Sequence, residues 1–134
     1  MGISRDIPGF VSLRAAHSVA ETLERLEASL AQRGIAVFAR IDFSADAARV
    51  GLQMRPEQLL IFGNPRAGTP LMQQLPEVGL DLPLKALAWE DEQGQTWLAY
   101  NDLQYIAQRY RMDGSSTERL AGVLPLLEAA AGTG

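Results

Sequence analysis

Cysteine is absent from this sequence, and histidine occurs only once, as His17. Disulfide bonds, iron–sulfur clusters and thiolate zinc sites are therefore excluded. A lone imidazole cannot form a histidine-rich metal site, and a catalytic base needs partners within hydrogen-bond reach that the sequence does not identify. We interpret His17 as a surface residue just before a helix. We accordingly expect no metal and no cofactor, and we favour a protein that is not an enzyme.

Long apolar runs are also missing. No stretch approaches the roughly 18 consecutive apolar residues that a membrane span requires. The first ten residues mix Arg5, Asp6 and Pro8 and do not form the apolar core of a signal peptide. We therefore expect a cytoplasmic protein that does not cross a membrane.

Positive charge is in deficit as well. The net charge is −4 and the isoelectric point is near 4.9. Sequence-independent binding to nucleic acid needs a basic surface that neutralises phosphates, and no such stripe is visible. We expect neither nucleic acid nor an anionic membrane surface as a partner.

What remains is an ordinary globular composition. The chain has 134 residues, of which 47% are hydrophobic and 21% are charged, a balance typical of a folded domain of common size. It shows no internal repeat and no linker. We expect a single domain over residues 1–134, with frayed ends at 1–8 and 129–134.

The clearest predicted element is a helix that begins at Ser18. Ser18 and Glu21 have the spacing of a capping box, and Gly34 is placed to end the helix. Between them runs one apolar stripe at helical period, formed by Val19, Leu23, Leu26 and Leu30.

Five short apolar segments predict strands. The last two flank the turn 91–94, which favours a β-hairpin, and the continuous apolar run 59–62 is typical of a strand covered on both faces. The predicted strands are Phe10–Arg14, Ile35–Phe43, Gln58–Phe62, Leu84–Glu90 and Gln95–Tyr100.

Further helices are predicted from their capping residues. Ser44 can cap a brief helix, Thr69 can cap a helix with Pro70 in its first position, and Asn101 or Asp102 can cap another. A last helix begins near Ser115 and should kink or restart at Pro125. The resulting order is β-α-β-(α)-β-(α)-β-β-α-α, an α+β fold with a mixed or antiparallel sheet and helices packed on it.

One stretch combines turn residues with a fixed cation. From Gly63 to Thr69 the glycines allow close approach to the backbone, and the predicted helix start would offer free amides to an anion. Arg66 adds a planar fork of donors. The candidate ligand-binding residues are Asn64, Arg66, Gly68 and Thr69, with Lys85 and Tyr100 nearby if the sheet folds as predicted.

Simpler interpretations stay open. The stretch lacks the Gly-Lys-Ser or Gly-Lys-Thr ending of a phosphate loop, so its glycines and prolines can equally serve backbone geometry alone. Trp89 and Trp97 should face each other across the hairpin, either as core or as part of an oligomer interface. The acidic turn 90–92 is more simply a solvated loop than a metal site.

Several segments resemble the domain-of-unknown-function 302 family. They include Leu59–Pro65, Gly68–Met72 and Leu80–Lys85, and the similarity continues through Trp89–Asp91, Tyr100–Asp102 and Ala107–Tyr110. Thr22 and Val37–Asp42 also look like that family. The resemblance implies a compact α+β domain with a fold like that of the TATA-binding protein, and it implies no activity. Phe43 stands where family members commonly carry histidine.

The sequence thus leads to two hypotheses. The first is a small domain that binds a small anionic ligand at the Gly63–Thr69 stretch. The alternative is a non-catalytic structural or interaction module that acts as a homodimer, in which the same stretch serves only the fold.

Overall fold

A computed structural model describes residues 6–132 of the chain. Five strands form one sheet with the spatial order β1-β5-β4-β3-β2, and every neighbouring pair is antiparallel. The strands are β1 (Phe10–Ala15), β2 (Ala36–Asp42), β3 (Glu57–Gly63), β4 (Leu84–Glu90) and β5 (Thr96–Asn101).

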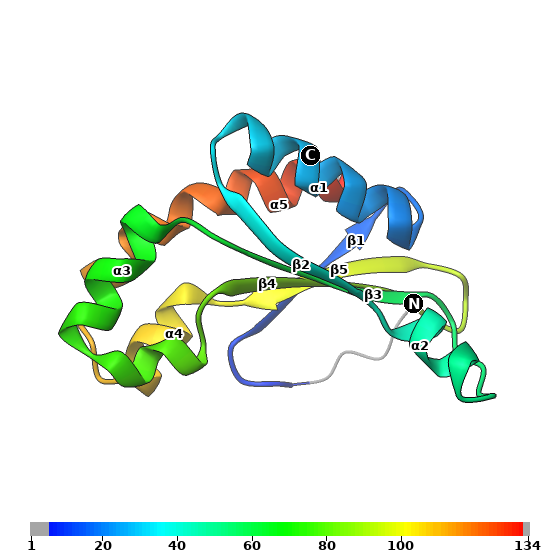
Figure 1. The fold of residues 1–134 in the computed structure, drawn as a ribbon. Helices are drawn as coiled ribbons and strands as arrows, with labels where there is room; N and C mark the ends of the chain where they lie inside the picture. The colour runs from blue at the N-terminus through cyan, green and yellow to red at the C-terminus, as the bar shows by residue number, and fades with distance from the viewer. Residues whose placement is uncertain (1–5, 133–134) are drawn as a thin grey trace.

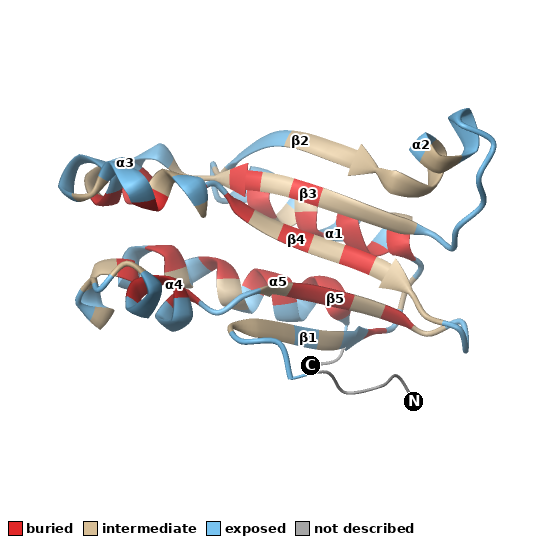
Figure 2. Ribbon diagram, turned by 90° about the horizontal axis from the view of Figure 1, so that it is seen from below, coloured by how far each residue is buried: buried red, intermediate tan, exposed pale blue. Residues whose placement is uncertain are grey.

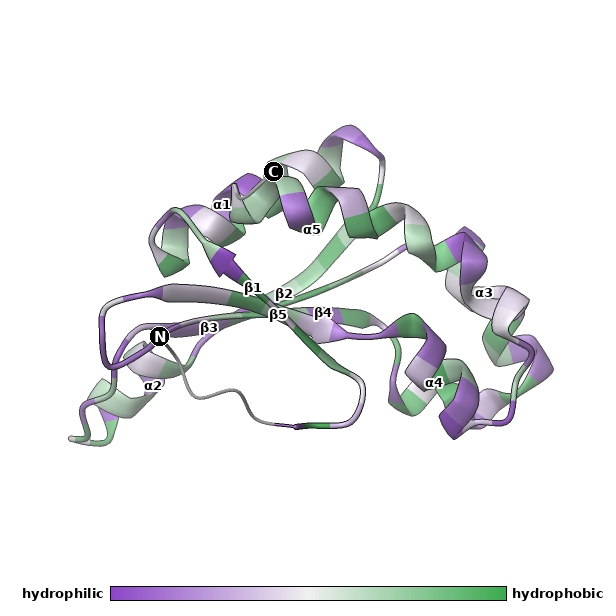
Figure 3. Cartoon of the chain, turned by 180° about the vertical axis from the view of Figure 1, so that it is seen from behind, coloured by the Kyte–Doolittle hydropathy of each residue, from purple (hydrophilic) through white to green (hydrophobic). Residues whose placement is uncertain are grey.

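Helices and strands follow one another in the predicted order, with β4 and β5 joined by a turn, so the α+β expectation is confirmed (Figure 1). They are α1 (Val19–Gln32), α2 (Phe43–Arg49), α3 (Pro65–Gln74), α4 (Leu103–Arg109) and α5 (Leu124–Ala131), joined by two 3-10 segments, η1 (Pro76–Leu80) and η2 (Gly114–Val123). Helices α1 and α5 lie side by side over one face of the sheet, and α3 and α4 lie beyond one end of it (Figures 1 and 3).

The core lies between that helix layer and the covered face of the sheet. The predicted stripe of α1 is confirmed, because Leu23, Leu26 and Leu30 are all fully buried. Every second strand residue points to the same face, so Leu60, Ala86 and Leu98 meet the helices from three adjacent strands. Burial of these apolar side chains supplies the main stabilising term of the fold.

The predicted cap and the glycine end of α1 are present, but within residues 6–132 only one of the two hydrogen bonds of the predicted capping box forms. The Ser18 hydroxyl accepts a hydrogen bond of 3.1 Å from the backbone N–H of Glu21, and Gly34 adopts a left-handed φ of +69° just after the helix, where glycine has no steric penalty. The carboxylate of Glu21 pairs with His17.

Three other helix starts differ from prediction because an earlier side chain provides the cap. Asp42, not Ser44, caps α2 by accepting from the Ala45 N–H at 2.9 Å. Asn64 caps α3, so that helix begins at Pro65 and not at Pro70, which lies inside it. Asp113 caps a 3-10 segment where an α-helix from Ser115 was expected.

A helix restarts near Pro125, as predicted. A new helix, α5, begins at Leu124, with Pro125 in its first turn, where a missing N–H leaves no hydrogen bond unmade. Ala130 and Ala131, which lie in the segment expected to fray, are helical and buried. The expected fraying of residues 1–8 falls mostly outside the described residues.

The prediction that β3 is covered on both faces is wrong. Leu60 and Phe62 are buried against the helices, but Leu59 and Ile61 on the other face are only partly buried. Figure 2 looks onto that face and shows no helix in front of the strands. Within residues 6–132, no helix combines the length and the apolar character that crossing a bilayer requires.

Candidate functional site

The predicted ligand stretch is the end of a strand and the first turns of a helix. Pro65 has no N–H, the Arg66 N–H donates to Asn64 Oδ1 at 3.0 Å, and the N–H groups of Ala67 and Gly68 both donate to the Asn64 carbonyl at 2.9 Å. The start of α3 therefore offers no free backbone donor to an anion, because Asn64 already satisfies those amides.

The side chains of this stretch point in different directions. Gly68 is buried, and a Cβ added to it would meet Leu82 at an ordinary contact distance of 3.9 Å. Thr69 and Arg66 are exposed. Among the described residues, the guanidinium of Arg66 has no hydrogen bond or ion pair. It is therefore a free cation on the surface.

A different feature appears where the two central strands separate. The β4–β5 ladder runs from Glu90–Thr96 to Leu87–Ala99 and stops there. Lys85 continues to pair only with Ile61 of β3, and Asn101 only with Phe10 of β1. Figure 2 shows the two strands diverging toward α4. We call this region the β4–β5 opening.

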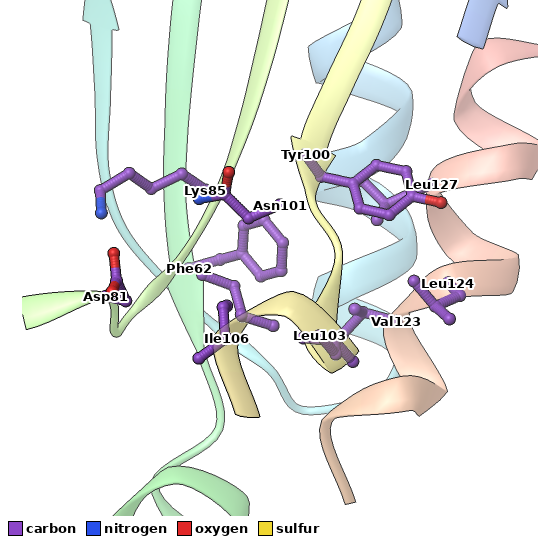
Figure 4. Close-up of a pocket in the computed structure, with 11 residues that line it drawn as sticks. Phe62, Asp81, Lys85, Tyr100, Asn101, Leu103, Ile106, Val123, Leu124 and Leu127 are labelled. Carbon is purple, nitrogen blue, oxygen red and sulfur yellow. The ribbon is translucent and has the colours of Figure 1, made fainter. Parts of the chain in front are cut away.

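The opening contains a small pocket (Figure 4). Its floor is apolar, and its polar groups come from the chain just before β4, from the start of β4 and from the end of β5. The space open to a water molecule is about 10 Å³, which is the size that holds a single water. The pocket is lined by Phe62, Asp81, Leu84, Lys85, Tyr100, Asn101, Leu103, Ile106, Val123, Leu124 and Leu127.

Asp81 is the anchored charge of this pocket. Its Oδ2 accepts a hydrogen bond of 2.7 Å from Arg109 and one of 2.6 Å from the Tyr110 hydroxyl. The bond to Asp81, with some burial, raises the pKa of Tyr110 above its ordinary value. These contacts tie the start of β4 to α4, so Asp81 holds the opening in shape.

Among the described residues, the lining side chains of Lys85, Tyr100 and Asn101 have no such partners. Lys85 is the only lysine of the sequence, and within residues 6–132 its ammonium group has no hydrogen bond or ion pair. Burial raises the pKa of Tyr100, and the charges of Glu128 and Asp102 raise it further. The phenol therefore stays neutral and can act as a hydrogen-bond donor at physiological pH.

The structure thus brings two predicted site residues together and leaves four elsewhere. Lys85 and Tyr100 line the pocket, whereas Asn64, Arg66, Gly68 and Thr69 do not. Sequence reasoning missed Asp81 and Asn101. Both lie in segments that resemble the family, and this resemblance was the one signal that could have pointed to them.

The acidic turn has a structural role. Asp91 accepts hydrogen bonds from the Trp97 indole at 2.8 Å and from the backbone N–H groups of Gln93 and Gln95 at 2.9 and 3.0 Å. The indole bond above all lowers the pKa of Asp91. In the part of the chain that the structure describes, no group of three or more His, Cys, Asp or Glu residues is placed to hold a metal ion.

The centre of the uncovered side of the sheet is apolar and aromatic. The ring centroids of Trp89 and Trp97 lie 6.4 Å apart in a stacked pair, as the hairpin register predicted, and Phe10 lies 6.1 Å from Trp89. An antiparallel sheet face left to solvent normally alternates to polar residues. We call this surface the open face; its large apolar residues are Phe10, Ile41, Leu59, Ile61, Leu87, Trp89 and Trp97, and the register places the charged Arg14, Glu57 and Lys85 at its margins.

Comparison with known proteins agrees with this architecture. The model of the family "Domain of unknown function DUF302" matches residues 11–129. The chain belongs to this family. The crystal structure of an uncharacterized conserved DUF302 protein from Bacillus stearothermophilus has a similar fold, with a TM-score of 0.76 over 92% of this chain and 96% of that one, at 23% sequence identity.

Curated relatives are longer proteins. The chain is 49% identical over 108 residues to "Fluoride-specific ion channel FluC 1" of Brucella suis biovar 1 (strain 1330), covering 81% of this chain and 42% of that protein. The protein of the same name from Brucella abortus biovar 1 (strain 9-941) matches at the same identity, with 40% of its length covered. The chain therefore spans less than half the length of these relatives.

Proposed function

We propose that this domain is an interaction module that forms a homodimer through its open face. The observation that carries the proposal is an apolar, aromatic sheet face that no helix of residues 6–132 covers. Figure 2 shows this face directly, and Figure 1 shows the helix layer on the opposite side. The apolar residues of this face are only partly buried, and contiguous apolar surface that stays accessible marks protein contact sites.

The open face has the composition of an interface. Tryptophan and phenylalanine are enriched in interface cores, and charged residues are depleted there. Strands of six and seven residues, five of them side by side, present an area of roughly 20 by 20 Å. A second copy fits this surface because two equal faces related by a twofold axis cover each other without leaving a new apolar patch.

The molar mass in solution tests the proposal. Light scattering coupled to size exclusion should give twice the chain mass of 14.6 kDa, and hydrogen exchange should show protection of β3 and β4 that decreases on dilution. A monomer at concentrations of about 100 µM, well above the Kd of a specific interface, would overturn it. We further infer a cytoplasmic location, which suits a chain without cysteine.

A second proposal is supported by the β4–β5 opening. We propose that it takes one small inorganic anion of about the size of a water molecule, with the ammonium of Lys85 as counter-charge. The pocket volume supports an occupant of that size, and the curated relatives carry the name of fluoride channels. Arg66, an exposed cation on α3, is the alternative counter-charge.

Thermal unfolding in matched salts tests this second proposal. Sodium fluoride should raise the Tm relative to sodium chloride at equal ionic strength, because binding to the native state alone stabilises it. Equal Tm values in both salts up to about 100 mM would count against it.

A further inference from the structure

On the other side of Tyr100 lies a larger groove. It has a volume of about 250 Å³, close to the lower end of pockets that hold small organic molecules. It is formed between the start of β1, the entrance of α4 and the 3-10 segment η2. Tyr100, Leu103 and Leu124 line both this groove and the smaller pocket. The two spaces are therefore separated by the phenol ring and two leucines.

The groove has an apolar floor and an acidic rim. Val11, Leu103, Ala121 and Leu124 supply the floor with the buried Thr117, and the carboxylates of Asp102 and Glu118 stand on the rim with Gln104. No lysine or arginine lines it. The charged side chains that line the groove are therefore all negative.

The two rim carboxylates differ in how they are used. Asp102 accepts a hydrogen bond of 3.0 Å from the Gln104 N–H through Oδ1, as the cap of α4. Glu118 is exposed, and within residues 6–132 it has no hydrogen bond or ion pair. Glu118 is thus a free anion, and the remaining oxygen of Asp102 stands on the same rim.

The electrostatic surroundings of Tyr100 point the same way. Burial is the main reason that the pKa of this phenol is raised, and the negative charges of Glu128 and Asp102 add to it. The same field that disfavours a phenolate attracts a cation. The face of a tyrosine ring is itself attractive to an ammonium group within about 6 Å.

We propose that this groove binds a small organic cation, an amine with an apolar or aromatic body. The body packs on Val11, Ala121 and Leu124, and the ammonium group lies against Glu118 and the ring of Tyr100. The proposal is independent of the dimer and of the anion site, because it uses neither the open face nor Lys85. An organic anion of the same shape is excluded by the carboxylates, and a neutral one gains only the apolar contacts.

Three probes of nearly equal shape test the charge dependence: 2-phenylethylamine, 2-phenylethanol and phenylacetate. Titration followed by ¹⁵N–¹H correlation spectra should show saturable shifts at Tyr100, Ala121 and Leu124 with the amine. The alcohol should bind more weakly, and phenylacetate should not bind. Equal affinity of amine and acid, no saturable shift with any probe up to 20 mM, or shifts confined to the open face would overturn the proposal.

Variants locate the cation. Glu118→Gln should lower the affinity for the amine about two- to fivefold, the range of a partly exposed ion pair, and should leave the alcohol unchanged. Glu92→Gln, at the hairpin tip, is the matched control and should change neither. Ala121→Leu fills the groove and should abolish binding of both probes, with an unchanged far-ultraviolet circular dichroism spectrum as the check that it folds. Unchanged amine affinity in Glu118→Gln contradicts the assignment.

Discussion

The indole N–H of Trp97 donates a hydrogen bond of 2.8 Å to Asp91, across the turn that joins β4 to β5. This bond fixes the orientation of one ring of the Trp89–Trp97 stack on the open face. The carboxylate at the hairpin tip therefore helps to fix an aromatic ring on the surface that we propose as the dimer contact.

Acid should destabilise the protein through two carboxylates. Hydrogen bonds from Trp97 to Asp91 and from Ser44 to Asp42 are the main reasons that the pKa of each lies below the ordinary value of 3.8. Because the folded pKa is the lower one, their stabilisation is complete above about pH 5 and is lost as the pH falls through and below 3.8. Urea unfolding between pH 2.5 and 7 measures this loss. Asp91→Asn should make the decline shallower, and an unchanged pH profile in that variant would contradict its role.

The open face should fail to dimerise when a charge is placed at its centre. Leu87 lies between Leu59 and Ala99 in the register, so Leu87→Glu would put a carboxylate into the proposed contact and should convert the dimer to monomer. Leu52→Glu is the control, since Leu52 is 64% exposed in a loop away from the sheet. Sedimentation velocity separates the outcomes. A dimer that persists in folded Leu87→Glu places the contact elsewhere.

The anion proposal predicts that Lys85, and not Arg66, supplies the positive charge that binds fluoride. Lys85→Ala should remove the extra thermal stabilisation by fluoride, because it takes the single ammonium group from the β4–β5 opening. Arg66→Ala should retain it, and Arg55→Ala serves as a surface-charge control. Differential scanning fluorimetry in fluoride and chloride gives the comparison. If Arg66→Ala alone loses the effect, the anion binds at α3 as the sequence first suggested.

A buried and an exposed leucine should differ sharply on truncation. Leu26 is fully buried between α1 and the sheet, so Leu26→Ala should lower the free energy of unfolding by about 2–5 kcal/mol. Leu52→Ala should change it by less than about 0.5 kcal/mol. Chemical denaturation of both variants measures the difference. Similar values for the two would mean that the helix layer is not packed as described.

Gly9 should be less tolerant of alanine than Gly34. Both have a left-handed φ, +73° and +69°, which costs an alanine about 1–2 kcal/mol. A Cβ on Gly9 would also lie 2.4 Å from Cγ and 2.9 Å from Cβ of Tyr105, whereas nothing lies within 4 Å at Gly34. We expect a loss of about 2–5 kcal/mol for Gly9→Ala, measured against Gly34→Ala by urea unfolding. Equal losses would show that Tyr105 moves aside freely.

Local signals in the sequence determined the elements of this protein and their order. The capping of α1 by Ser18, the apolar stripe through Leu23, Leu26 and Leu30, and the facing of Trp89 and Trp97 all depend on spacing along the chain, which is visible without a structure. The start of α3 was misplaced because Asn64 and Thr69 are both good caps, and nothing local says which of them the preceding strand will bring into position.

Tertiary structure alone decided the candidate site. Lys85 and Tyr100 lie on separate strands, and both line one pocket because the β4–β5 ladder stops at Leu87–Ala99. The covering of one sheet face depended on where α1 and α5 return over the strands, so the apolar run of β3 gave no sign that Leu59 and Ile61 stay uncovered. A strand's pattern records how apolar its two faces are, and only the assembled layers determine which face meets a helix and which is left for a partner.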